Sequence, residues 1–110
     1  MQEAQLEATW MQFGGFRLDP VNYTITLTTG QVVRLTSVEF RMLYNLMSHA
    51  CLECTNRDIL RSVWGVYATR GRTCNTVAVY IRRLRHKIEA DPANPIHIIT
   101  VRSKGYLFQP

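Results

Sequence analysis

The sequence predicts an α+β fold, with strands at both ends of the chain and helices between them. β-branched and aromatic residues, interrupted by Gly and Pro, dominate residues 11–35 and 97–108. Between these two segments, aliphatic residues recur at intervals of three and four, which is the spacing of amphipathic helices. With 110 residues, the chain has room for one hydrophobic core and little more. Strands, three helices and a terminal hairpin, in this order, are typical of a winged helix-turn-helix with an added N-terminal antiparallel sheet.

The N-terminal third of the chain predicts a short polar lead followed by a small sheet. Residues 1–10 are polar, and we expect a disordered segment or the remnant of a linker ahead of a domain over 11–110. Three turn-forming pairs then divide the β-rich stretch, namely Gly14-Gly15, Asp19-Pro20 and Thr29-Gly30. We therefore expect short antiparallel strands at about 11–18, 23–28 and 31–35.

A change of period after residue 35 predicts the first helix. Thr36 is followed three residues later by Glu39, which is the spacing of a capping box, in which each side chain accepts from a free backbone N–H at the helix start. Helical spacing then places four residues on one apolar face, Phe40, Leu43, Tyr44 and Met47. This helix is expected to run to about residue 49.

The second predicted helix is shorter. Thr55 is its expected N-cap, and Gly65 its expected end. Ile59, Leu60 and Val63 have the spacing of an inward face. The stretch that follows is expected to be a loop with a basic tip formed by Arg70 and Arg72.

The third helix and a hairpin complete the predicted fold. The helix is expected over about 73–90, ending before Pro92. The hairpin, over 97–108, has a Ser-Lys-Gly turn in which Gly105 is expected to supply a positive φ.

Charge is distributed unevenly along the chain. Residues 1–55 carry three Arg or Lys and five Asp or Glu, whereas residues 56–110 carry ten and three. Such an excess in one half suggests a polyanionic partner, although an ordinary basic surface is the alternative. No run approaches the roughly 18 apolar residues of a membrane span, and the start of the chain lacks a signal peptide's positive region. We therefore expect a cytoplasmic protein.

The cysteine and histidine residues do not predict a metal or catalytic site. Three cysteines, Cys51, Cys54 and Cys74, argue against a secreted disulfide framework. The C-x-x-C spacing is compatible with zinc, but a closed structural site usually has two such pairs, so we expect buried reduced thiols instead. No motif pairs His49, His86 or His97 with a nucleophile or a carboxylate, and no glycine loop suits a phosphate. We expect no enzyme activity, no metal and no cofactor.

The third helix has an apolar side and a cationic side. On a helical wheel, Val77, Ile81, Leu84 and Ile88 fall within about 40° of one another and form the core stripe. The opposite side carries Asn75, Val79, Arg82, Arg83 and His86, together with Arg72 if the helix begins early. Arg85 and Lys87 lie on the flanks.

This cationic side is either a solvated charged face or a surface for a polyanion. Solvated faces usually alternate charges of opposite sign, but residues 73–88 contain no acid. Each like-charge pair costs about 0.2–0.5 kcal/mol in water, whereas a phosphate backbone makes the same cations favourable through counterion release. Val79 can contact a thymine methyl in the major groove, between arginines that reach guanine or phosphate. The residues therefore favour DNA binding.

The hairpin tip supports the same function. Arg102 and Lys104 place two cations at a narrow turn, which fits an adjacent minor groove. For an isolated hairpin, a polar turn without a binding role would be the simpler interpretation. The alternative function for the whole chain is a winged-helix interaction module that binds an acidic protein with its basic face.

Four stretches, in chain order, together resemble the effector domain of OmpR/PhoB-type response regulators. They are LTSVEFRML, TNRDILRSVWG, NTVAVYIRRLRHKI and ITVRSKGYLF, and the similarity covers about residues 13–108. The resemblance implies sequence-specific binding of double-stranded DNA for transcription control in a bacterial two-component system. Residues expected at base edges are Val79, Arg82, Arg83 and, in the minor groove, Arg102. Residues expected at phosphates are Trp64, Thr76, Tyr80, Arg85 and Thr100, to which the wheel and the hairpin add Arg72, His86 and Lys104.

The resemblance also implies partners. Domains of this family typically bind direct-repeat DNA as head-to-tail dimers, follow a phosphoacceptor receiver domain, and can contact RNA polymerase through the loop that corresponds to residues 65–72. Five positions depart from the family pattern: Asn56 for Arg, Asn75 for Arg, Ala78 for Asp, Tyr80 for His and Ser103 for Gly. Without a carboxylate at position 78 to orient Arg82, the target sequence is expected to differ from those of the family.

Overall fold

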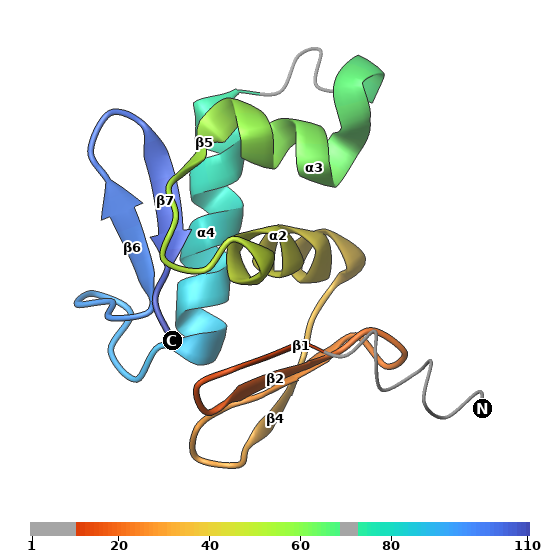
Figure 1. The fold of residues 1–110 in the computed structure, drawn as a ribbon, viewed down its shortest axis with the longest axis vertical. Coiled ribbons are helices and arrows are strands. Elements are labelled where there is room, and N and C mark those ends of the chain that lie inside the picture. The colour runs from red at the N-terminus through yellow and green to blue at the C-terminus, as the bar shows by residue number, and fades with distance from the viewer. Residues whose placement is uncertain (1–10, 69–72) are drawn as a thin grey trace.

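Two antiparallel sheets and three helices make up the computed structural model, which describes residues 11–68 and 73–110, without the side chains of 66–68. The elements, in chain order, are β1 (Met11–Phe13), β2 (Phe16–Asp19), β3 (Thr24–Thr26), β4 (Val32–Arg34), α2 (Ser37–Ser48), β5 (Cys54–Thr55), α3 (Asn56–Ala68), α4 (Cys74–Ile88), β6 (Ile98–Val101) and β7 (Gly105–Phe108). In Figure 1 the N-terminal sheet lies below the helices, and the β6–β7 hairpin stands beside α4. The predicted winged helix-turn-helix is confirmed. The predicted linker over 1–10 falls outside the described residues.

The N-terminal sheet is a four-stranded meander in the order β1-β2-β3-β4. The strand expected over 11–18 is wrong as a single element, because Gly14-Gly15 forms the turn of a hairpin that pairs Phe13 with Phe16. The strands expected at 23–28 and 31–35 are confirmed but shorter. Phe16, Leu18 and Ile25 are fully buried, so one face of this sheet covers the core.

Helix α2 begins where the capping box predicts. Glu39 N–H donates to Thr36 Oγ1 over 3.2 Å, and Thr36 N–H donates to Glu39 Oε1 over 2.9 Å. The expected apolar face is correct for three of its four residues, but Tyr44 is 42% exposed. The buried side is centred on Leu43 and Leu46, because α2 packs against both other helices and both sheets. Tyr44 falls at the edge of that side, where its ring lies 6.0 Å from the ring of Phe40 between centroids.

Helix α3 has the predicted N-cap and a break near its end. Asp58 N–H donates to Thr55 Oγ1 over 3.0 Å, which confirms the cap. Gly65 has φ 83° and ψ 170°, a conformation that side chains resist and that glycine adopts freely. The helix therefore breaks at Gly65 as expected, but a further turn follows as far as Ala68.

Helix α4 is slightly shorter than the 73–90 expected. Thr73 caps its start, in a box with Thr76 that the sequence pattern did not predict. The core stripe is confirmed, because Val77, Ile81, Leu84 and Ile88 are all buried. The helix ends at Glu89 rather than just before Pro92, because Glu89 is extended and its carboxylate accepts the backbone N–H groups of Ile96, His97 and Ile98.

The C-terminal hairpin, called the wing below, belongs to a three-stranded sheet in the order β5-β7-β6. Its predicted turn is present, but the positive φ of 65° belongs to Ser103 and not to Gly105. Gly105 is needed for another reason: a Cβ at this position would overlap the carbonyl of Cys54, with which β7 pairs at β5. Strand β5 was not predicted, since two residues carry no readable period.

A single core joins the two sheets. The Phe16 ring, from β2, lies edge-on to His97 and Phe108 at centroid distances of 4.6 and 5.5 Å. Of the three cysteines expected to be buried, only Cys54 is; Cys51 and Cys74 are exposed. Burial raises the pKa of the Cys54 thiol, and the nearby charge of Asp58 adds to this effect.

Candidate nucleic-acid interface

The cationic side of α4 faces solvent, as the helical wheel predicts. Val79 is 48% exposed, and Arg82 and Arg83 are exposed beside it. Asn75 and His86 are exposed on the same side. Because helix residues 74–88 contain no acid, this surface presents only cations, one aliphatic group and neutral polar groups.

A hollow of about 570 Å³ runs along this side of α4. It is lined by Glu39, Val79, Arg82, Arg83, His86 and Lys87. A second hollow, of about 500 Å³, lies toward the end of the helix and is lined by Arg82, Arg85, His86, Asp91, Pro92 and Ala93. Arg and Lys outnumber carboxylates at both hollows, three to one at the first and two to one at the second, and this balance favours phosphate.

Two aromatic residues that were predicted to contact phosphate pack together where α3 meets α4. The rings of Trp64 and Tyr80 lie 5.7 Å apart between centroids, and both side chains are half-buried. The Arg83 guanidinium lies over Tyr80, with its Cζ 5.0 Å from the ring centroid. Stacking of this kind limits where the Arg83 side chain can point. Thr76, also half-buried, bonds to the Thr73 backbone at the helix start.

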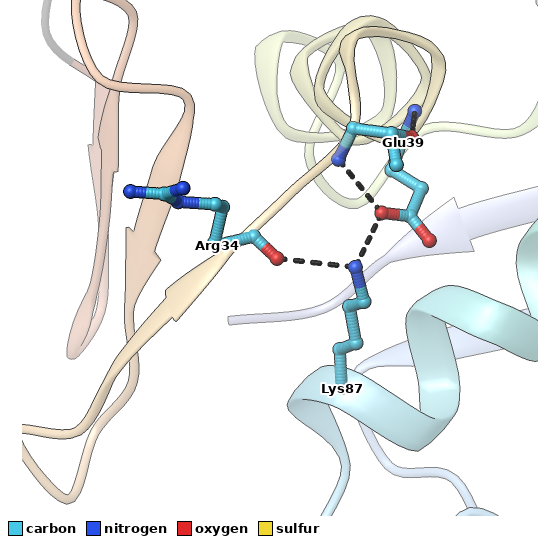
Figure 2. Close-up of polar contacts among 4 residues, drawn as sticks. Arg34, Glu39 and Lys87 are labelled. Carbon is cyan, nitrogen blue, oxygen red and sulfur yellow. Dashed lines mark hydrogen bonds and ion pairs between the residues drawn. The ribbon is translucent and has the colours of Figure 1, made fainter.

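Lys87, on the flank of α4, is directed into the protein. Its ammonium lies 2.6 Å from Glu39 Oε1 and donates to the carbonyl of Arg34 over 3.1 Å (Figure 2). Burial alone would raise the pKa of Glu39, but the hydrogen bonds from Lys87 and Thr36 and the Lys87 charge outweigh it and hold the pKa below the ordinary value. One lysine thereby joins α4 to α2 and to the end of β4.

Arg85, on the other flank, is directed toward the wing. Its Nε and Nη2 donate to the carbonyl of Ile98 over 3.1 and 2.8 Å, and Nη2 also donates to Thr100 Oγ1 over 2.8 Å. The guanidinium also lies 5.7 Å from the ring centroid of Tyr106 on β7. Its predicted phosphate contact stays a prediction, but much of its hydrogen-bonding capacity is used within the protein.

The wing tip presents the two predicted cations. Arg102 and Lys104 are exposed in the turn, and Thr100 is exposed near the end of β6, two residues before Arg102. Lys104 Nζ lies 3.8 Å from Glu53 Oε2, and both side chains are more than half exposed, so this pair contributes little to stability. Lys104 O accepts from the backbone N–H and the side-chain amide of Asn56, over 3.1 and 3.4 Å. The turn is thus tied to the start of α3.

Some residues of the predicted interface lie outside the part of the chain that the structure describes. Arg72, and residues 69–72 of the predicted polymerase-contacting loop, lie outside the described residues. The sequence analysis missed the structural roles of four residues. Lys87 and Glu39 form an internal ion pair. Glu89 caps the loop after α4, and Asn56 anchors the wing turn. Only Glu39 had a sequence signal, and that signal indicated the capping box alone.

The described part of the chain shows neither a metal-binding cluster nor a membrane-spanning helix. No cluster of three or more His, Cys, Asp or Glu side chains there is arranged to hold a metal ion. None of its helices has the length and hydropathy needed to cross a membrane.

Residues 30–108 match the protein family described as "Transcriptional regulatory protein, C terminal". The chain is 43% identical over 95 residues to a probable transcriptional regulator, ycf27, of Porphyridium aerugineum, covering 86% of this chain and 40% of that protein. It is 38% identical over 96 residues to the sensory transduction protein RegX3 of Mycobacterium leprae, covering 87% and 47%. The chain thus spans less than half the length of these relatives.

Solved structures show the same fold. The RstA DNA-binding domain of Klebsiella pneumoniae, in complex with the RstA box, superposes with a TM-score of 0.78 at 36% identity, covering 93% of this chain and 98% of that one. The response regulator DrrB of Thermotoga maritima, an OmpR/PhoB homologue, gives a TM-score of 0.77 at 29% identity, covering 92% and 44%.

Proposed function

Because this chain belongs to the family of C-terminal domains of transcriptional regulatory proteins, of the OmpR/PhoB winged-helix type, we propose that it binds double-stranded DNA sequence-specifically to control transcription. Helix α4 would lie in the major groove and the wing would reach the adjacent minor groove. One observation carries the proposal: the exposed side of α4 holds Val79 between Arg82 and Arg83 and no acid.

Each side chain has a role that its chemistry supports. Val79 would contact a thymine methyl, and Arg82 and Arg83 would donate to guanine O6 and N7 or to phosphate. Arg102 would enter the minor groove, where a narrow A·T-rich step concentrates negative potential. Contacts that fix register on the backbone would come from Trp64, Arg72, Thr76, Tyr80, Arg85, His86, Thr100 and Lys104.

The relatives support a proposal about the wider setting of the domain. RegX3 is a sensory transduction protein more than twice as long as the matched segment, and DrrB is a response regulator. We propose that this chain is likewise a cytoplasmic effector domain that acts with a receiver domain and is not itself an enzyme. Binding to direct repeats as a head-to-tail dimer, and contact with RNA polymerase through residues 65–72, are further parts of this proposal.

Binding to random duplex DNA at rising salt tests the proposal. Fluorescence anisotropy should show an affinity that falls linearly on a log–log plot, with a slope of about 0.9 per phosphate contacted. Selection from a random oligonucleotide pool, followed by footprinting, should then enrich one sequence. That sequence should bind about 10³-fold or more tightly than random DNA.

The alternative, a module that binds an acidic protein, predicts a different result. Under that function no sequence would be enriched from the random pool. That outcome would overturn sequence-specific DNA binding.

A further inference from the structure

We propose that Arg85 is a positioning residue: it fixes the wing relative to α4, so that Arg102 and the recognition helix are held at a set separation before DNA arrives. The part of this inference that concerns DNA rests on the proposed function. The part that concerns the wing itself does not, because it is a property of the free protein.

The bond geometry is the first argument. Two nitrogens of the guanidinium, Nε and Nη2, converge on the single carbonyl of Ile98, and Nη2 also reaches Thr100 Oγ1. A planar fork of donors is a property of arginine, and lysine cannot reproduce it. Arginine has five N–H groups, of which the wing engages three, leaving the pair on Nη1 for other partners. Most of the donors of Arg85 therefore hold β6, and only those on Nη1 are left for a phosphate.

The place where Arg85 acts is the second argument. Ile98 is completely buried, and both of its backbone polar groups are held from the end of α4: its carbonyl by Arg85 and its N–H by the carboxylate of Glu89, over 2.8 Å. Ile98 begins β6, the strand that leads directly to Arg102. Because Ile98 is held in place, the position of Arg102 just beyond the far end of β6 is restrained as well.

The other end of the wing is held as well. Lys104 N–H donates to the carbonyl of Val101 over 3.0 Å, which closes the turn, and Asn56 binds Lys104 O at the start of α3. Strand β7 is paired on both of its edges. The tip and the β7 edge of the wing are thus held from α3 and β5, and Arg85 adds the link that holds the β6 edge to α4.

A role as a phosphate ligand makes a different prediction from a role in positioning. Arg85→Lys keeps the positive charge, so a phosphate contact would largely persist, but the fork to Ile98 and Thr100 would be lost. Thr100→Val removes one acceptor of that fork and leaves the Arg85 charge in place. Arg41→Lys, at an exposed arginine of α2, is the matched control.

The test in the free protein is hydrogen exchange of backbone amides, followed by NMR on the 110-residue chain. In Arg85→Lys, amides of β6 and β7 should exchange about tenfold faster or more, because a charge-assisted bond that restrains them is gone. Thr100→Val should accelerate the same amides to a smaller extent, and amides of α2 should not change. Arg41→Lys should match the unmodified chain. Wing exchange that is unaltered in both Arg85→Lys and Thr100→Val would overturn the inference.

The test on DNA uses the duplex sequence enriched by the unmodified chain and a double-mutant cycle of Arg85→Ala, which removes the charge as well as the fork, with Arg102→Ala. If Arg85 acts through the wing, the double variant should bind no more weakly than Arg102→Ala alone. Losses that multiply, with a salt slope about one lower, would instead make Arg85 an independent phosphate ligand and overturn the DNA part of the inference. If the unmodified chain enriches no sequence, the proposed function fails, and hydrogen exchange still decides whether Arg85 positions the wing.

Discussion

Val79 is exposed among cations, and these neighbours suggest a role for it in binding DNA. A single exposed aliphatic residue is ordinary on a protein surface. Here the neighbouring exposed side chains are Arg82 and Arg83, and a hollow runs alongside all three. A short side chain without donors or acceptors lets the helix approach a base edge closely, while the arginines supply the hydrogen bonds.

Val79→Asp tests this residue directly. We expect it to abolish binding of the enriched duplex, because a carboxylate would meet the phosphates and base edges at the centre of the interface. The fold should be retained, since Val79 is 48% exposed. Anisotropy and circular dichroism would measure the two effects. Val21→Asp, at a residue 63% exposed in the N-terminal region, should bind normally; loss of helical signal in Val79→Asp would mean that Val79 supports the core.

Arg83→Ala should weaken binding of the enriched duplex by about 1–3 kcal/mol and relax specificity at one base position. A competition assay against every single-base variant of that duplex would measure this. Because Arg83 also lies over Tyr80, thermal unfolding of the free variant should be recorded and should change only slightly. Equal loss on all sequences would show that Arg83 is a phosphate contact.

At the scale of elements, one turn of α4 holds the helix in place. Lys87 joins it to α2 and β4, and Arg85 and Glu89 join it to the wing. Two of the cations that make this end of the helix basic are therefore engaged within the protein. The outward cations, Arg82 and Arg83, are left for a ligand.

The Glu39–Lys87 pair should make stability depend on acid pH. The folded state holds the pKa of Glu39 below its ordinary value of 4.5, so the carboxylate contributes stability that is complete above about pH 5.5. That contribution should be lost as pH falls through 4.5 toward the lower, folded-state pKa. Urea unfolding between about pH 3 and 7 would measure it, and Glu39→Gln should flatten the curve in that window. A variant with the same pH dependence as the unmodified chain would show that other carboxylates cause it.

The wing turn carries local strain. Ser103 has φ 65°, a conformation that costs an ordinary residue roughly 1–2 kcal/mol and costs glycine little. Ser103→Gly should relieve this strain, but glycine also has more conformational freedom in the unfolded chain, which offsets part of the gain. The net result should be a free energy of unfolding that is higher by about 0.5–1 kcal/mol. Urea unfolding at neutral pH would show it. Gly105→Ala is the opposing control, and should destabilise because its Cβ would overlap the Cys54 carbonyl; a destabilised Ser103→Gly would contradict this account of the turn.

At the scale of the molecule, charge and architecture coincide. Residues 11–55, which form the N-terminal sheet, α2 and β5, carry three Arg or Lys and three Asp or Glu, whereas the described residues from 56 onward, which form α3, α4 and the wing, carry eight and three. Helix α4 and the wing stand side by side (Figure 1). A domain measuring 41 × 33 × 22 Å thus gathers its cations on the elements proposed to meet DNA.

Binding through this surface should stabilise the fold by mass action. The enriched duplex at about 100 times its dissociation constant should raise the free energy of unfolding by roughly 2.7 kcal/mol. Thermal unfolding with and without DNA would measure the shift, which should shrink at high salt and in Arg83→Ala. A shift that does not depend on salt would contradict an interface made of phosphate contacts.

Local patterns in the sequence were sufficient for most elements of the fold. The capping box of α2, the Thr55 cap, the buried stripe of α4 and the outward direction of Val79 depend on residues within about two turns of one another, so spacing alone reveals them. The same patterns could not locate β5, could not separate β1 from β2, and gave Gly105 a positive φ that belongs to Ser103. Each of these depends on how a segment meets a partner strand.

The sequence by itself determined that one helix buries an aliphatic stripe and exposes an acid-free cationic side, because helical period and charge are local properties. Only the tertiary structure decided which cations are exposed to a ligand. Lys87 meets Glu39 across 48 positions, and Asn56 meets Lys104 across the same separation. A long charged side chain can reach solvent or a distant carbonyl with equal ease, so its partner is set by the folding of the whole chain.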